Sequence, residues 1–279
     1  MIRCARRLFP HAVLGAVMVT LSWQGAPAQM PRTAPAPSGI AVDVELVLAV
    51  DISYSMDPQE QTLQREGYMR GLTSREFLNA VRQGMIGKIA VTYVEWAGYY
   101  EQKVIVPWRV IEGPESADAF VSELAAAPYR RAARTSISGA IEFGSRLFET
   151  SGYRGTRRVI DVSGDGANNH GQIITIARDE ALAKGITING LPFMAKRLNY
   201  ATMDIERLDI YYEDCVIGGP GSFVIPIEGP ERFVEATRTK LVLEIAGLVP
   251  PVRIIPASAR TPRVSCTIGE RLWQERWGN

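Results

Sequence analysis

The chain has 279 residues, of which 46% are hydrophobic, and its formal charge is +1 at pH 7. A charge balance this close to neutral gives no reason to expect a nucleic-acid partner. The apolar content and length suit one well-buried domain of about 250 residues better than two small ones.

The first 28 residues have the pattern of a secretory signal peptide. Three early arginines precede an apolar run over residues 12–21, and Ala26-Pro27-Ala28 is a small-x-small cleavage signal. The run is shorter than the roughly 20 residues that span a bilayer, and no later segment is apolar enough to do so. We therefore expect an exported protein, periplasmic or secreted, with no transmembrane segment after signal removal. The pair Arg6-Arg7 leaves the twin-arginine route open beside the general one.

Composition divides the remaining chain into three parts. Residues 29–40 are rich in proline and alanine and cannot pack a core, so they form a leader. Residues 41–247 form the predicted domain. Residues 248–279 form a C-terminal tail that shows no clear periodicity.

The domain opens with a buried strand that ends in polar side chains. The run of valine, leucine and alanine before Asp51 is too apolar to face water on either side, which is typical of a central strand in a covered parallel sheet. Ligands of such sheets bind at the carboxyl ends of the strands. Asp51, Ser53 and Ser55 follow this strand directly and would lie at that edge.

Strands and helices alternate along the rest of the domain. This alternation predicts a doubly wound α/β fold, with a mostly parallel sheet, helices on both faces and one antiparallel edge strand contributed by a hairpin. The further strands are predicted at residues 89–96, 102–111, 157–163, 185–193 and 222–226. The helices are predicted from residue 58, and at residues 74–83, 116–127, 137–148, 173–184, 200–214 and 233–246.

Two more oxygen-bearing side chains fall at the ends of predicted elements. Thr135 lies in the loop before a helix, and Asp165 follows the strand that ends at residue 163, so both would reach the same sheet edge as Asp51. Short oxygen ligands of this kind suit a hard divalent cation such as Mg²⁺.

With these residues in place, the chain resembles a von Willebrand factor type A domain over roughly residues 42–246. The metal-ion-dependent adhesion site of that family corresponds to Asp51-Ile-Ser53-Tyr-Ser55, Thr135 and Asp165-Gly166. The resemblance implies Mg²⁺ as the ion, with Mn²⁺ or Ca²⁺ possible, and a binding module whose ion takes an Asp or Glu side chain from a protein partner. The chain also resembles a bacterial branch of exported type A proteins that is classed as a domain of unknown function. The similar segments are the one around Asp51 and residues Tyr93–Trp96, Val162–Asn169 and Cys215–Gly221.

Charged and aromatic residues next to these positions suggest a partner-contact rim. It comprises Tyr54, Arg130, Arg131 and Arg134, and the arginines either steer an acidic partner or form a solvated loop. Further aromatic candidates for the rim are Tyr99, Tyr100, Trp96 and Trp108, with Trp96 alternatively in the core.

Other polar residues near the predicted edge have competing interpretations. Asp57 either contacts the metal or caps a helix, and Glu95 and Asp161 either contact it or serve the fold. Asp161 lies inside an apolar strand and needs a partner, for which Arg134 and Lys88 are candidates. For His170, a loop position without a role is favoured over a ligand or base.

The cysteines fit an oxidising compartment. Cys4 leaves with the signal peptide, which leaves Cys215 and Cys266. We expect them to form a disulfide that closes a loop of about 50 residues and ties the tail to the domain. Two free thiols are the alternative.

Two other functions remain as alternatives. A metal-dependent hydrolase of the haloacid dehalogenase type would carry a second carboxylate where Ser53 stands, and neither Gly-x-Ser-x-Gly nor Gly-x-x-x-x-Gly-Lys occurs. The third alternative is a structural domain of the same fold without a metal.

Overall fold

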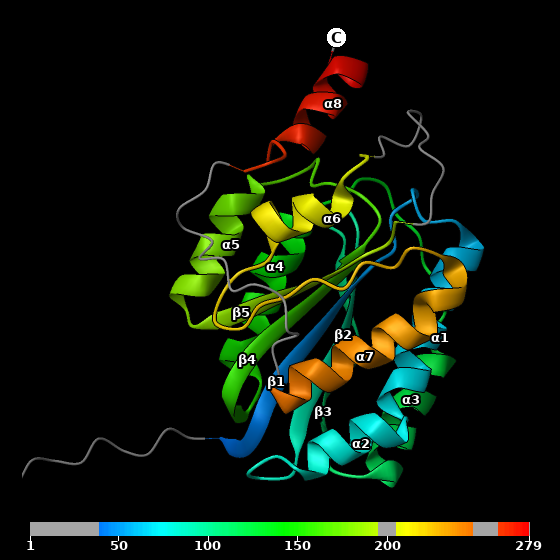
Figure 1. The fold of residues 1–279 in the computed structure, drawn as a ribbon, viewed down its shortest axis with the longest axis vertical. Coiled ribbons are helices and arrows are strands. Elements are labelled where there is room, and N and C mark those ends of the chain that lie inside the picture. Colours follow the sequence, from blue (N-terminus) through cyan, green and yellow to red (C-terminus); the bar gives the residue numbers. More distant parts are fainter. Residues whose placement is uncertain (1–38, 195–204, 248–261, 279) are drawn as a thin grey trace, which may run out of the picture. The chain divides into compact units, whose positions relative to one another are not determined.

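The computed structural model describes residues 39–194, 205–247 and 262–278. Its centre is a five-stranded sheet in the order β3-β2-β1-β4-β5, with β1 in the middle (Figure 1). β1 runs parallel to β2 and β4, β5 runs parallel to β4, and β3 is the antiparallel edge strand beside β2. The predicted fold class is confirmed. The strands are β1 (Ile40–Asp51), β2 (Ile89–Trp96), β3 (Gln102–Ile111), β4 (Tyr153–Gly164) and β5 (Ile186–Pro192).

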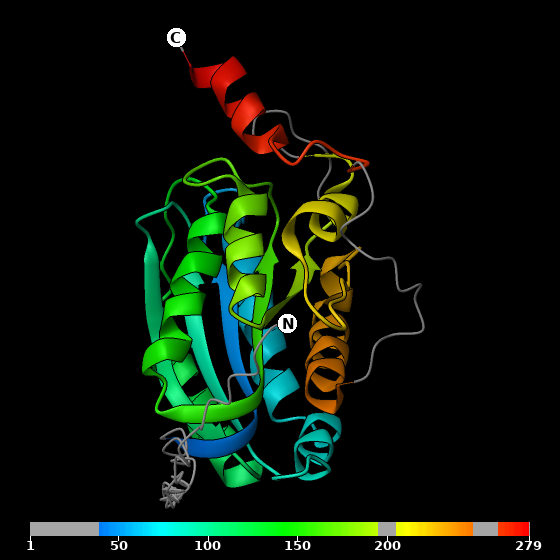
Figure 2. The same ribbon diagram turned by 90° about the vertical axis from the view of Figure 1, so that its left-hand side faces the viewer.

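Helices cover both faces of the sheet. Side chains of α1, α2, α3 and α7 join one hydrophobic cluster, and those of α4, α5 and α6 join the other. Figure 2 shows α7, in orange, and the green α4 and α5 on opposite sides of the sheet. The helices are α1 (Pro58–Leu72), α2 (Arg75–Arg82), α3 (Pro114–Ala126), α4 (Ile137–Leu147), α5 (Ile174–Ala183), α6 (Leu208–Tyr211), α7 (Phe233–Ala246) and α8 (Ile268–Trp277). A π-helical turn, Tyr212–Val216, and two 3₁₀ turns, Phe148–Thr150 and Pro230–Arg232, complete the helical elements.

β1 is apolar from Leu46 to Val50, where both of its faces are covered. Leu46 and Leu48 point into the cluster under α1 and α7, whereas Val47 and Ala49 point into the cluster under α4. Alternate side chains of a strand face opposite sides of a sheet, so a strand covered on both faces buries consecutive positions, as β1 does from Val44 to Asp51. This burial places the polar residues after β1 at the edge of a rigid sheet.

Side chains cap the starts of two helices. Asp57 accepts a 2.8 Å hydrogen bond from the Glu60 amide, and the Glu60 carboxylate accepts one of 2.7 Å from the Asp57 amide. This reciprocal pair begins α1. Ser74 accepts a 3.2 Å hydrogen bond from the Phe77 amide at the start of α2.

The prediction of a strand at residues 222–226 is wrong. This segment runs beside β5 through isolated bridges, Gly190 with Val224 and Phe193 with Ile227. The Gly190 amide donates to the Phe223 carbonyl, but Pro192 has no amide hydrogen with which to continue a ladder.

The C-terminal part also differs from the prediction. Within the predicted helix at 200–214, the regular α-helix begins only at Leu208, and residues 200–204 lie outside the described residues. The tail contains α8, which was not predicted. The signal peptide lies outside the described residues, as does the leader up to residue 38. In the part of the chain that the structure describes, no helix is long and apolar enough to cross a membrane.

Candidate functional site

The loop after β1 folds its polar side chains toward one another. The Ser53 amide donates a 2.7 Å hydrogen bond to Asp51 Oδ1, and the hydroxyls of Ser53 and Ser55 lie 2.7 Å apart. From α1, the Gln64 amide group donates to the Asp51 carbonyl over 3.1 Å. Asp51 and Ser53 are buried, so the loop is held by the fold rather than by solvent.

Asp165 joins this group from the end of β4. Ser55 Oγ donates a 2.7 Å hydrogen bond to Asp165 Oδ1. Gly164 allows a close approach to Asp51, because a side-chain carbon added there would lie 2.8 Å from Asp51 Oδ2. The two carboxylates therefore lie at neighbouring strand ends, as predicted.

Thr135 reaches the same edge through the loop between α3 and α4. The Tyr54 amide donates to the Ala132 carbonyl over 2.9 Å, which pairs this loop with the loop after β1. Thr135 exchanges hydrogen bonds with Asn169, one from its amide to Asn169 Oδ1 at 3.0 Å and one from the Asn169 amide to its carbonyl at 2.8 Å. The five predicted positions thus lie on three loops that are bonded to one another.

Burial strongly affects the pKa of one carboxyl in this group. Burial raises the pKa of Asp51 to about 8, and the nearby Asp165 carboxylate adds to the rise, while the Ser53 amide opposes it. Asp51 Oδ2 has no hydrogen-bond partner among the described residues. No group of three or more His, Cys, Asp or Glu side chains suited to a metal occurs in the described ranges. The group at this edge instead combines two carboxylates with three hydroxyls.

The predicted rim residues are partly engaged in structural contacts. The Arg131 guanidinium donates to the carbonyls of Tyr54 and Met56, at 3.0 and 2.5 Å, and lies 5.3 Å from the Tyr54 ring centre. Arg130 lies 3.6 Å from Glu101 in an ion pair. Arg134 has a left-handed backbone, with φ of 73°, and stacks on Trp273. Tyr54 itself is exposed.

The three remaining acids serve the fold. Asp57 is the N-cap of α1, which confirms the capping interpretation. Glu95 forms a buried 2.6 Å ion pair with Arg65 of α1. The predicted partners of Asp161 are wrong, because Lys240 of α7 forms the ion pair with it. The sequence did not reveal this pair, since it depends on which face α7 turns toward β4.

The aromatic candidates divide between core and surface. Trp96 is fully buried in the core. Trp108 was wrongly assigned to the rim, because it packs on Tyr153 at the start of β4, the opposite end from Asp165. His170 Nδ1 accepts a 3.0 Å hydrogen bond from the Tyr99 amide, and burial together with Arg134 lowers the pKa of His170. The histidine therefore fixes a loop next to the group.

Sequence reasoning gave no role to Asn168, which is fully buried. Its side chain accepts a 2.9 Å hydrogen bond from the Ser138 amide and donates to the Gln172 carbonyl and Glu270 Oε1, over 3.1 and 2.8 Å. A signal for it was the pair of asparagines just after Asp165-Gly166. The predicted disulfide between Cys215 and Cys266 is confirmed.

Solved structures with a similar fold include von Willebrand type A and adhesive proteins. Proximal thread matrix protein 1 from the mussel byssus, with a zinc-occupied MIDAS motif, is 12% identical, with a TM-score of 0.55, over 75% of this chain and 49% of that chain. The von Willebrand factor type A protein from Catenulispora acidiphila is 14% identical, with a TM-score of 0.51, over 74% and 43%. The pilus adhesin SpaC from Lactobacillus rhamnosus GG is 13% identical, with a TM-score of 0.52, over 75% and 30%.

The chain spans about half the length of the mussel protein and less of the other two. At these identities the likeness shows the fold alone, which is of the von Willebrand factor type A kind. Among curated proteins, no significant match was found. A family model matches residues 41–249, and the chain therefore belongs to the family described as "Protein of unknown function (DUF1194)".

Proposed function

We propose that this protein is an exported binding module that holds a divalent cation and, through it, an acidic side chain of a protein partner. The observation that carries this proposal is the unpaired, buried Asp51 Oδ2 beside the hydrogen-bonded chain of Ser53, Ser55 and Asp165. A buried carboxylate oxygen without a donor is costly, and a cation is the natural partner for it. The ligands would be Asp51, Ser53, Ser55, Thr135 and Asp165.

The donor set fits a hard cation. All five side chains offer oxygen, and Mg²⁺ accepts an octahedron of oxygens in which water fills the remaining positions. Mg²⁺ is therefore the expected ion, with Mn²⁺ and Ca²⁺ as alternatives. The zinc-occupied MIDAS motif of the mussel protein supports adding Zn²⁺ to the test. Two carboxylates leave the bound cation attractive to a further carboxylate.

The surroundings support an acidic protein partner. Arg130 is part of the loop beside Thr135, and it pairs with Glu101 at 3.6 Å, a separation that an incoming acid could compete with. Tyr54 is 60% exposed next to Ser53 and Ser55, and exposed tyrosines often anchor protein contacts. Two of the similar structures are named as a thread matrix protein and a pilus adhesin, which supports a role in protein contacts.

Export is supported by the N-terminal sequence and by the disulfide, since disulfides persist in oxidising compartments. N-terminal sequencing of the protein recovered from the periplasm or medium tests cleavage after Ala28. A mature chain that still begins at Met1 would contradict it.

Titration calorimetry of the purified protein with Mg²⁺, Mn²⁺, Ca²⁺ and Zn²⁺ tests the metal site. We expect saturable binding, weakened at least tenfold by Asp51→Asn, on the scale of losing a direct ligand. The matched control is Asp57→Asn, which makes the same change two residues beyond the group and keeps a good N-cap. No saturable binding by the wild type, or equal effects of the two variants, would contradict the proposal.

Partner capture from the native compartment, with and without chelator, tests whether the bound cation holds an acidic protein partner. The expected partner is retained only with metal, is lost with Asp51→Asn and is released by free glutamate at high concentration. Metal-dependent turnover of phosphate or ester substrates that Asp51→Asn abolishes would instead indicate a hydrolase.

A further inference from the structure

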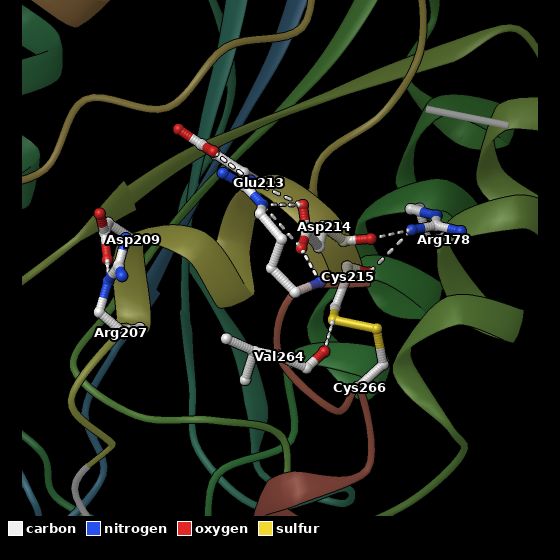
Figure 3. Close-up of polar contacts among 9 residues, drawn as sticks. Arg178, Arg207, Asp209, Glu213, Asp214, Cys215, Val264 and Cys266 are labelled. Carbon is white, nitrogen blue, oxygen red and sulfur yellow. Dashed lines mark hydrogen bonds and ion pairs between the residues drawn. A yellow bond between two sulfur atoms is a disulfide. The ribbon is translucent and has the colours of Figure 1, made fainter. Parts of the chain in front are cut away.

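The C-terminal segment 262–278 is fastened beside the candidate site. Figures 1 and 2 both show α8, in red, beyond the carboxyl ends of the strands. Cys266 forms its disulfide with Cys215 in the π-helical turn, as Figure 3 shows. That turn is itself held by Arg178 of α5, which donates to the carbonyls of Asp214 and Cys215 at 2.9 and 3.3 Å.

Polar contacts fasten the segment next to the disulfide. The Arg263 amide donates a 2.6 Å hydrogen bond to Asp214 Oδ2, and its guanidinium reaches Glu213 and Asp214 at 2.5 and 2.7 Å. The Cys215 disulfide sulfur also lies 3.9 Å from the carbonyl oxygen of Val264, whose side chain packs on the cluster under α4 and α5. The chain therefore enters α8 from an anchored position.

The first turn of α8 lies against the loop that carries Asp165. A side-chain carbon added at Gly269 would lie 2.1 Å from the Asn168 carbonyl oxygen, so only glycine allows this approach. The neighbouring Glu270 accepts a 2.8 Å hydrogen bond from Asn168 Nδ2. Tyr211, four residues before Cys215, accepts the Asn168 amide hydrogen at 3.1 Å. Both sides of the disulfide thus contact Asn168.

The next turn of α8 lies against the loop that carries Thr135. The Trp273 ring covers the Arg134 guanidinium at 3.2 Å. Among the described residues, Arg134 is the one non-glycine residue with a positive φ. Residues other than glycine keep this conformation when neighbouring contacts hold them in it. Trp273 supplies such a contact directly beside Thr135.

We propose that α8 is a positioning element for the candidate metal site, with Glu270 holding Asn168, Trp273 holding Arg134 and the Cys215–Cys266 disulfide holding the helix in place. This inference rests on the proposed function, because the loops it positions carry Asp165 and Thr135. Partners that orient a ligand affect metal affinity without touching the ion. Glu270 and Trp273 are therefore expected to act through loop order rather than as ligands.

Hydrogen exchange of the metal-free protein provides a readout that does not depend on metal. The amides to follow are those of Thr135, Ser138, Asn168 and Asn169, each of which donates a hydrogen bond to one of these two loops or to Tyr211. We expect Glu270→Ala and Trp273→Ala to speed their exchange about tenfold, because local opening becomes easier. Amides of β1 should not change.

Calorimetric titration with Mg²⁺ provides the second readout. Each variant should weaken Mg²⁺ binding about tenfold, the lower end of the effect of losing a group that orients a metal ligand. The matched control is Glu275→Ala, the same change on an exposed residue of α8. Trp273→Phe should restore most of the affinity, since a phenyl ring also stacks on a guanidinium.

Reduction of the folded wild type with dithiothreitol keeps the test decisive if a variant fails to fold. Opening the disulfide should speed exchange of the same four amides. Unchanged exchange and affinity in both variants and after reduction would overturn the inference, even where the wild type binds metal. If the wild type binds no metal in its own titration, the proposed function is overturned instead.

Discussion

Ser55 Oγ donates a 2.7 Å hydrogen bond to Asp165 Oδ1, which joins the ends of β1 and β4 across 110 positions of sequence. Asp51 lies in the same group, and burial and Asp165 raise its pKa to about 8, so without a cation its carboxyl is protonated at neutral pH and is repelled by Asp165 once it ionises. Under the proposed function, a bound cation would offset this unfavourable burial of Asp51 next to Asp165.

Asp165→Asn should therefore have opposite effects with and without metal. Above about pH 8, where Asp51 ionises, we expect the metal-free variant to unfold at a higher temperature than the wild type, because the repulsion between residues 51 and 165 is gone. Saturating Mg²⁺, at about 100 times its dissociation constant, should stabilise the wild type by about 2.7 kcal/mol and the variant much less. Thermal unfolding with Mg²⁺ or with chelator measures both, and a variant that gains as much from Mg²⁺ as the wild type would contradict the assignment.

Asp57→Ala should lower stability and leave the metal affinity unchanged. Asp57 caps α1 through reciprocal hydrogen bonds with Glu60, and loss of such a cap costs about 1 kcal/mol. Denaturant unfolding and a Mg²⁺ titration measure the two quantities. Asp57→Ser is the control that should recover the stability, since serine also caps helices. A loss of metal affinity in the alanine variant would reopen the ligand interpretation of Asp57.

The predictions that succeeded rest on local patterns. The strand before Asp51, the hairpin of β2 and β3 and the cap at Asp57 are determined by residues close in sequence, so periodicity and capping chemistry reveal them. The position of Asp165 followed from the rule that parallel strands end at one edge of a sheet, and that of Thr135 from its place in the loop before a helix.

The predictions that failed depend on tertiary contacts. The segment beside β5 looked like a strand, but proline interrupts its pairing with that neighbour. α8 has a weak amphipathic pattern, and it contacts the domain through Glu270, which bonds to Asn168, and Trp273, which stacks on Arg134. Lys240 as the partner of Asp161 could be found only once the packing of α7 on the sheet was known.

Lys240→Met should be strongly destabilising. Lys240 is fully buried and forms ion pairs with Asp161 and, at 2.6 Å, with Glu244. Methionine would leave two buried carboxylates without a cation, a change that costs about 3–5 kcal/mol. Urea unfolding measures it. The control is Lys184→Met, which breaks an exposed 3.2 Å pair with Glu149 and should change stability by about 0.5 kcal/mol or less. Equal effects of the two substitutions would contradict the importance of the buried network.

Glu244→Gln should remove a pH dependence of stability. Burial and Asp161 raise the pKa of Glu244 from 4.5 to about 7, although Lys240 opposes the rise. The native protein therefore binds this proton more tightly than the unfolded chain does. Its contribution to stability is complete below pH 4.5 and is lost as the pH rises through about 7.

The free energy of unfolding of the wild type should accordingly fall between pH 4.5 and 7, and that of Glu244→Gln should fall less. Groups that face Glu244 include Asp161 and Arg157 of β4. Glutamine can still accept from Lys240 and Asn189, so the fold should persist. Glu235→Gln, on the exposed face of α7, is the control and should keep the wild-type slope. Parallel slopes for Glu244→Gln and the wild type would place the titrating group elsewhere.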